Sequence, residues 1–197
     1  MNWNPVEPKH HDALLSLARE SIKFGIDNGS VMEVDPASYP APLRETLSTY
    51  VTLHKRGDLR GCIGHLEARY PLVVDLVHSA YAAAFHDTRF PPVSEEELNE
   101  IDISISVLSP LEEIEFSSEE DLLQKVIPGK DGLVLQDHGL RGCFLPVMWE
   151  RLPSPEIFLK FLKEKAGLPH SYWSETLRVF RFRAQKIPNG KGDSHLP

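Results

Sequence analysis

The chain has few cysteines, no long apolar run and no excess of basic residues. Its 197 residues include two cysteines, too few for a disulfide framework and typical of a reducing cytoplasm. No apolar run approaches the roughly 20 residues of a membrane-spanning helix, and the polar first 20 residues do not resemble a signal peptide. Lysine and arginine number 21 against 29 acidic residues, a net charge of −8. This charge argues against nucleic acid as a partner, and we expect a cytoplasmic protein with no membrane association.

Both cysteines lie in copies of one short pattern. The first copy is Leu59-Arg60-Gly61-Cys62-Ile63-Gly64, and the second is Leu140-Arg141-Gly142-Cys143-Phe144. Each follows a turn pattern, at Arg56-Gly57-Asp58 or at His138-Gly139, and each precedes a helical pattern. The order strand, turn, strand, helix thus occurs twice. This order predicts an internal duplication with the two hairpins related by a pseudo-twofold axis, and a chance match is the alternative.

The apolar periodicity predicts an α+β fold with β-hairpins and packed helices. Helices are expected over residues 8–28, 71–86 and 154–166, and strands over 47–53, 59–64, 101–107, 133–135, 140–144 and 176–187. In the helix that begins at Ser154, the following side chains are expected to be buried: Ile157, Phe158, Phe161, Leu162 and Ala166. At 41% apolar residues, residues 1–187 can form a single domain whose two subdomains share a core. The Gly- and Ser-containing residues 188–197 are expected to be a disordered tail.

The first copy carries the best candidate for chemistry, because alternation along a strand places Arg60, Cys62 and Gly64 on one face. A guanidinium near a thiol favours the thiolate, which makes Cys62 a candidate nucleophile, redox centre or soft metal ligand. The alternative is that Cys62 is a small buried apolar residue and Arg60 pairs with a carboxylate elsewhere. A three-residue turn would bring His54 to the same face as a possible base, whereas a two-residue turn would reverse that register.

The loop Asp87-Thr88-Arg89-Phe90-Pro91-Pro92 is a second candidate element. Arg89 is suited to bind an anionic ligand, since a guanidinium pairs bidentately with carboxylate or phosphate. Alternatively, Asp87 caps backbone amides, Arg89 forms an ion pair and Phe90 fills the core. With Gly61 and Gly64 permitting close backbone approach, these residues complete the predicted ligand site. No metal-ligand spacing or nucleotide-binding glycine pattern is present, so no metal is expected and the cofactor is unknown.

The sequence resembles the AMMECR-one domain family from about Leu14 to Lys186. The resemblance rests on several segments in the same order: Leu59 to Gly64, Ala80 to Pro92, Ser104 to Leu108, Gly129 to Leu133, Leu145-Pro146 and Lys165 to Leu168. It implies an α+β fold of two subdomains around a cleft that the hexapeptide lines. It implies no established reaction, and it suggests an association with a dioxygenase-like protein or a radical enzyme. Cys143 departs from the family pattern, where an aliphatic residue is more usual.

These observations predict a protein that binds a small anionic ligand or metabolite in a cleft around Arg60 and Cys62. The sharper version is an enzyme in which Cys62 acts as a thiolate. The alternative is a non-enzymatic adaptor whose Pro-rich loops and Phe90 region dock a partner protein.

Overall fold

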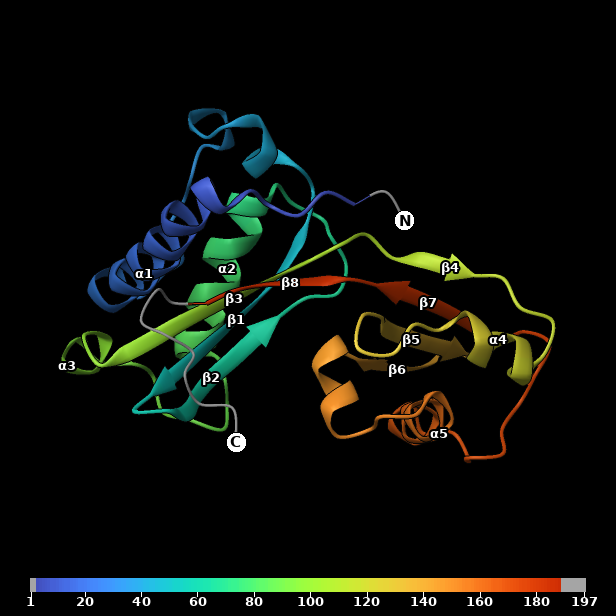
Figure 1. Ribbon diagram of the computed structural model, residues 1–197. Helices are drawn as coiled ribbons and strands as arrows, with labels where there is room; N and C mark the ends of the chain where they lie inside the picture. Colours follow the sequence, from blue (N-terminus) through green and yellow to red (C-terminus); the bar gives the residue numbers. More distant parts are fainter. Residues whose placement is uncertain (1–2, 189–197) are drawn as a thin grey trace. The chain divides into compact units, whose positions relative to one another are not determined.

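The structure is a computed structural model that describes residues 3–188, and the chain divides into two compact units (Figure 1). The first unit comprises residues 3–108 and 185–188, and the second comprises residues 109–184. Each unit contains helices and one four-stranded sheet. The predicted α+β class is therefore confirmed.

The first unit has the sheet order β2-β1-β3-β8. In chain order its elements are a 3₁₀ turn at Pro8–His10, α1 (His11–Asn28), 3₁₀ turns at Pro36–Ser38 and Ala41–Arg44, β1 (Ser48–Lys55), β2 (Asp58–Gly64), α2 (Leu72–Phe85), α3 (Glu95–Leu98), β3 (Ile101–Leu108) and β8 (Ala184–Ile187). Helix α1 ends where Gly29 adopts a left-handed conformation, with φ of 67°. A capping box formed by Ser94 and Glu97 begins α3. Strand β2 lies at the edge of this sheet, so one side of its backbone has no neighbouring strand.

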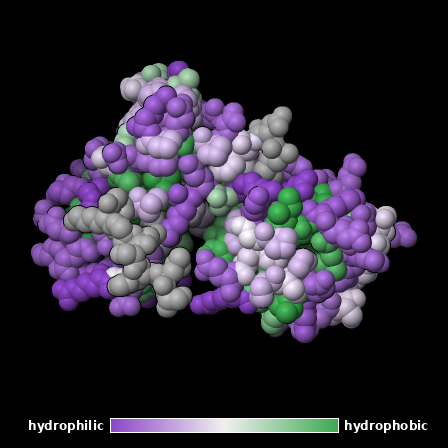
Figure 2. Space-filling view, in the orientation of Figure 1, coloured by the Kyte–Doolittle hydropathy of each residue, from purple (hydrophilic) through white to green (hydrophobic). Residues whose placement is uncertain are grey.

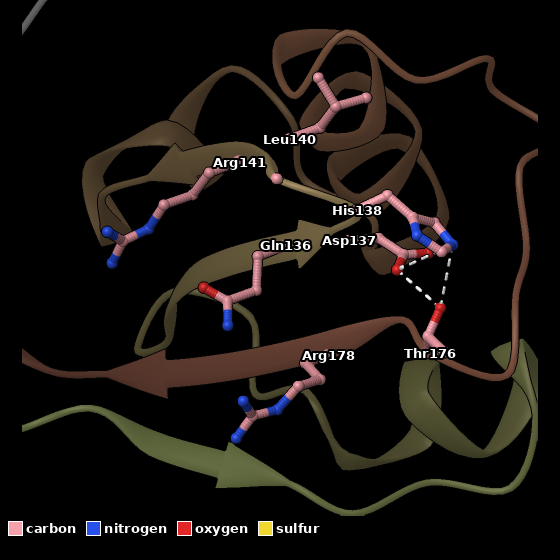
Figure 3. A pocket seen from close by; sticks show the side chains of 8 residues that line it. Gln136, Asp137, His138, Leu140, Arg141, Thr176 and Arg178 are labelled. Carbon is pink, nitrogen blue, oxygen red and sulfur yellow. Dashed lines mark hydrogen bonds and ion pairs between the residues drawn. The ribbon is translucent and has the colours of Figure 1, made fainter.

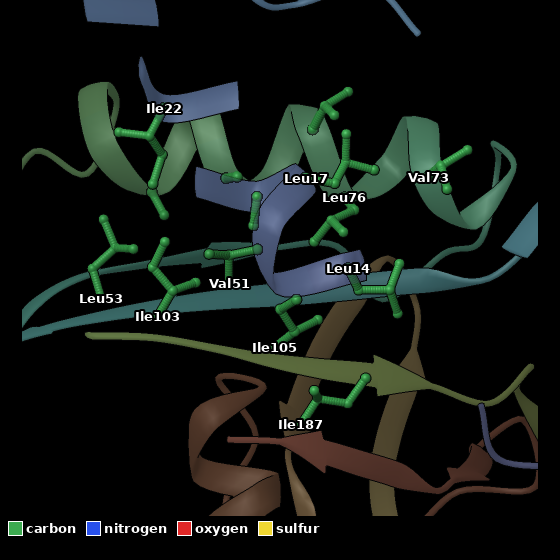
Figure 4. Packing of buried hydrophobic residues seen from close by; sticks show 14 of the residues in the cluster. Leu14, Leu17, Ile22, Val51, Leu53, Val73, Leu76, Ile103, Ile105 and Ile187 are labelled. Carbon is green, nitrogen blue, oxygen red and sulfur yellow. The ribbon is translucent and has the colours of Figure 1, made fainter. Parts of the chain in front are cut away.

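The core of the first unit lies between its two long helices and the sheet (Figure 4). Leu14 and Ile22 of α1 and Leu76 of α2 are fully buried against alternate residues of the strands, such as Val51 and Ile105. This alternation is the period of a sheet with one covered face. The other positions of β1 and β3 are mostly polar, and among them Thr52 of β1 belongs to the candidate site.

The second unit has the sheet order β4-β7-β5-β6. Its elements are β4 (Glu112–Ile114), α4 (Glu119–Lys125), β5 (Gly132–Asp137), β6 (Leu140–Phe144), a 3₁₀ turn at Pro146–Glu150, α5 (Pro155–Lys165) and β7 (Arg178–Phe182). Ser118 and Ser154 accept hydrogen bonds from backbone amides at the starts of α4 and α5. A separate apolar cluster surrounds Phe158, whose ring stacks on Trp149 at 3.9 Å between centroids.

Two expectations about the second half of the chain are wrong. The segment expected as one last strand is two strands, β7 and β8, which belong to different sheets and are separated at Arg183. Helix α5 leaves Ile157 and Phe161 about 40% exposed and instead buries Leu159 and Lys163. Lys163 is accommodated because its apolar stem packs inside and its Nζ donates to Glu119 at 2.7 Å. The predicted tail lies almost wholly outside the described residues.

Candidate functional site

The strand that carries the first Leu-Arg-Gly-Cys copy, β2, contains a bulge at Arg60. Its connection to β1 is a two-residue turn of Arg56 and Gly57, both with positive φ. The ladder pairs His54 with Leu59 and then Leu53 with Gly61, so Arg60 is the extra residue. The bulge shifts the pairing by one residue. Beyond it, the hairpin therefore has the register expected from a three-residue turn, although its turn contains two residues.

The register beyond the bulge determines which side chains lie on the same face as Cys62. Thr52 lies opposite Cys62, and Tyr50 lies opposite Gly64. His54 lies opposite Leu59 rather than Arg60. The structure therefore brings Thr52 to the thiol and does not pair His54 with Arg60.

The half-buried thiol of Cys62 sits in a polar setting. Its Sγ is 3.3 Å from Oγ1 of Thr52, and its backbone N–H donates to Oδ2 of Asp87 at 2.8 Å. Because β2 is an edge strand, one side of its backbone has no neighbouring strand to pair with. Asp87 supplies the missing acceptor at Cys62.

Asp87 also holds Arg89. The Nε and Nη2 atoms of Arg89 donate to Asp87 at 2.8 and 2.6 Å, and the Arg89 amide adds a third bond. These bonds from Arg89 hold the pKa of Asp87 far below its usual range, and the carboxylate raises the pKa of Arg89 in return. The Asp87 side chain is 5% exposed, whereas that of Arg89 is 55% exposed. Arg89 is therefore the member of this ion pair that faces solvent.

Arg60 is buried and bonded to the loop that follows α2. Its Nη2 donates to the carbonyl of Pro91 at 2.8 Å and to Glu97 at 2.9 Å. Lys55 donates to the same carboxylate, and the bonds from Arg60 and Lys55 lower the pKa of Glu97 to about 2. The guanidinium groups of Arg60 and Arg89 both lie within 6 Å of the centre of the Phe90 ring. The hydrogen bonds of Arg60 to Pro91 and Glu97 therefore hold residues 90–97 against β2.

Glu97 has a second role that the sequence did not predict. Its role in the capping box was readable from Ser94 three residues earlier. Its pairing with Arg60 and Lys55 joins residues far apart in the chain, and no local pattern signals it.

We expect the first unit to lose stability in mild acid because Glu97 becomes protonated and its ion pairs are lost. The folded pKa of Glu97, about 2, lies below its ordinary value of 4.5, so its contribution is complete above about pH 5 and is lost as the pH falls towards 2. The loss should be on the order of 2 kcal/mol. Urea midpoints of the first unit between pH 6 and pH 3 measure it, and Glu97→Gln should flatten the dependence. An equally steep pH profile in that variant would contradict the assignment.

The two glycines of the hexapeptide sit where a side chain has no space. A Cβ on Gly61 would lie 2.3 Å from the carbonyl oxygen of Ala83 in α2, and one on Gly64 would lie 2.2 Å from that of Thr49. Helix α2 thus packs directly on the backbone of β2. This packing accounts for Gly61, and the close approach of β1 accounts for Gly64. Contact of either glycine with a ligand stays a prediction.

The second copy forms a similar hairpin without the bulge. Its two-residue turn again has positive φ at both positions, and the ladder from β5 to β6 is regular. Gly142 lies against α5 as Gly61 lies against α2, since its Cβ would be 2.7 Å from the carbonyl of Leu162. Burial raises the pKa of the Cys143 thiol to about 11. Both cysteines are free, as expected, and a pseudo-twofold relation stays a prediction.

Residues 3–188 contain no group of three or more His, Cys, Asp or Glu side chains arranged to hold a metal ion. None of the helices in this range has the length and apolar composition of a membrane-spanning segment.

Comparison with known proteins finds similarity along nearly the whole chain. A family model described as AMMECR1 matches residues 15–187. A protein of Thermofilum pendens is 38% identical over 184 residues, covering 87% of this chain and 86% of the relative. A protein of Methanothermobacter thermautotrophicus is 37% identical over 187 residues, covering 94% and 97%. The crystal structure titled "Uncharacterized Protein PH0010", from Pyrococcus horikoshii, matches with a TM-score of 0.81 and 33% identity over 92% of each chain.

Proposed function

The chain belongs to the AMMECR1 family, and we propose that its functional site is the thiol of Cys62 with the guanidinium of Arg89, which together receive a small anionic ligand. In this proposal Arg89 binds the anionic group and Cys62 meets the reacting part of the ligand. We place the activity in the cytoplasm, the compartment where two unpaired cysteines persist.

The observation that carries the proposal is that Cys62 and Arg89 donate hydrogen bonds to the same oxygen atom of Asp87. Oδ2 of Asp87 accepts a hydrogen bond from the Cys62 amide at 2.8 Å and another from Nη2 of Arg89 at 2.6 Å. A single carboxylate oxygen thereby joins an exposed cation to the backbone of the residue that carries the half-buried thiol.

The chemistry of Arg89 and Cys62 favours an anionic ligand. Asp87 engages Nε and Nη2 of Arg89, which leaves the Nη1 edge directed elsewhere, and a guanidinium recognises carboxylate and phosphate groups. Thr52 places a hydroxyl 3.3 Å from Sγ, where it can donate to a thiolate. A thiolate in this position can act as a nucleophile.

Arg60 contributes as a positioning residue in this proposal. Its side chain is 9% exposed and bonds to Glu97 and to the carbonyl of Pro91, in the segment that follows Arg89. We assign no proton transfer to His54, because it lies opposite Leu59 in the ladder.

Two alkylating reagents that differ in charge test the proposal. Thiolates displace iodide from the neutral iodoacetamide and from the anionic iodoacetate, and mass spectrometry follows each cysteine separately. We expect Cys62 to react with both, and the ratio of iodoacetate to iodoacetamide rates to fall about threefold or more in Arg89→Gln. Arg89→Lys should largely keep the ratio because it keeps the charge. Cys143 should react far more slowly, since its raised pKa leaves little thiolate.

Arg69→Gln is the matched control, because Arg69 is also an exposed arginine bonded to a carboxylate two residues away. It should leave the ratio at Cys62 unchanged. An unreactive Cys62, or a ratio that Arg89→Gln does not alter, would overturn the proposal.

A protein-interaction module is the second candidate, and an observation in the second unit favours it. Helix α5 exposes Ile157 and Phe161 one turn apart, and Figure 2 shows hydrophobic residues at the surface of this unit among hydrophilic ones. Phe90 is a weaker docking residue than expected, since it is half-buried and lies against Arg60 and Arg89. An inert Cys62 in the alkylation test would favour this second candidate.

A further inference from the structure

The second Leu-Arg-Gly-Cys copy borders a cavity that the proposed function does not use. The cavity lies at the turn of the β5–β6 hairpin and has a volume of about 420 Å³ (Figure 3), within the size range of small-molecule sites. Its lining includes Gln136, His138, Leu140, Arg141, Thr176 and Arg178. All of these residues belong to the second unit.

Two arginines flank one glutamine across three neighbouring strands of this cavity. Gln136 of β5 lies opposite Arg141 of β6 and opposite Arg178 of β7. Residues directly opposite each other in a ladder share a face, and Figure 3 shows the three side chains on the same side of the sheet. The regular ladder of β6 leaves Arg141 exposed on this face, whereas the bulge in β2 leads to a buried Arg60.

Glu113 orients one of the two guanidinium groups. Nε and Nη2 of Arg178 donate to Glu113 at 2.7 and 2.6 Å, so the bidentate pair occupies one side of the fork. The side chain of Arg178 remains 53% exposed. A guanidinium held in this way keeps its Nη1 donors for a second acceptor.

Asp137 lines the other end of the cavity, where hydrogen bonds stabilise its negative charge. Its side chain is 1% exposed and accepts hydrogen bonds from the hydroxyls of Tyr172, Ser174 and Thr176. These bonds lower its pKa to about 2, so it remains a carboxylate whose oxygens point into its own hydroxyl cluster. Asp137 therefore anchors residues 172–176 beside the cavity, and its carboxylate oxygens are bonded to these hydroxyls rather than exposed to a ligand.

We propose that this cavity binds a small molecule through a phosphate or carboxylate group, with Arg141 and Arg178 contacting the oxyanion and the Gln136 amide between them. Leu140, 43% exposed at the rim, offers an apolar contact for the rest of the ligand. The chain's net charge of −8 disfavours a long polyanion. This site is separate from the one that contains Cys62 and does not depend on it.

The test is a nuclear magnetic resonance titration of the full chain with inorganic phosphate and, separately, with malonate. We expect saturable shifts of the Arg141 and Arg178 Nε–Hε signals and of the Gln136 side-chain amide. Arg141→Gln should weaken binding by about fivefold or more. Saturation by phosphate alone would identify a phosphate-bearing ligand, and saturation by malonate alone would identify a carboxylate-bearing one.

Arg151→Gln is the matched control, since Arg151 is an exposed arginine of the same unit outside the lining. It should leave the titration unchanged, and so should Arg89→Gln, which alters only the site proposed at Cys62. Shifts that increase linearly without saturation, or an Arg141→Gln variant that binds as the wild type does, would overturn this proposal and leave the first one intact.

Discussion

Gly61→Ala should destabilise the first unit by about 3 kcal/mol. The added Cβ would lie 2.3 Å from the carbonyl oxygen of Ala83 and 3.3 Å from its carbonyl carbon. Both atoms belong to the backbone of α2, so no side-chain rotation relieves the overlap. Helix α2 must move away from β2, which opens the packing around fully buried residues such as Leu76.

Hydrogen exchange in increasing urea measures this loss, with peptides from β1 and β3 reporting on the first unit. Regional readout is needed because the two units have separate apolar clusters. Gly29→Ala is the control, because Gly29 has a φ of 67° and no neighbouring atom lies within 4 Å of the place that a Cβ would occupy. It should cost only the roughly 1–2 kcal/mol of a left-handed alanine. A Gly61→Ala protein as stable as the Gly29→Ala protein would show that the contact between α2 and β2 is loose.

Glu97→Ala should cost the first unit about 3 kcal/mol. It removes the carboxylate that pairs with Arg60, whose side chain is 9% exposed, and it leaves that guanidinium buried with backbone carbonyls as its remaining acceptors. The carboxylate also bonds to Lys55 and to the Ser94 amide. Residues 90–97 should then open first, and exchange of the Phe90 and Val93 amides should accelerate.

Glu95→Ala in the same helix is the matched control. Glu95 pairs with Lys23, but its side chain is 67% exposed, so this change should cost no more than about 0.5 kcal/mol. Adding Arg60→Met to Glu97→Ala should recover part of the loss, because it removes the unpaired charge. If the double variant is less stable than Glu97→Ala alone, the buried charge is not the cause.

Local chemistry made most of the secondary structure predictable. Ser94 with Glu97, Ser118 and Ser154 all begin helices, and Gly29 ends one, because each satisfies or terminates backbone bonds within a few residues. The repeated hairpin was equally visible, since its turns and its glycines recur in both copies. These features need no knowledge of the rest of the chain.

The exposed residues of α5 were predicted less well. Its sequence offers apolar side chains on more than one face, and the sheet covers the face that carries Phe158, Leu159 and Leu162. Ile157 and Phe161 lie outside that contact. Which apolar stripe becomes buried depends on the partner surface, which periodicity alone does not describe.

By itself, the sequence determined the α+β class, the family and the hairpin repeat. Only the tertiary structure decided that Arg60 enters a bulge and pairs with Glu97, that Asp87 joins Cys62 to Arg89, and that Arg141 remains on an open sheet face. It also separated β7 from β8 into different sheets. The physical reason is range: caps and turns are satisfied within a few residues, whereas ion pairs, bulge registers and strand partners join groups tens of residues apart, and their geometry exists only once the chain has folded.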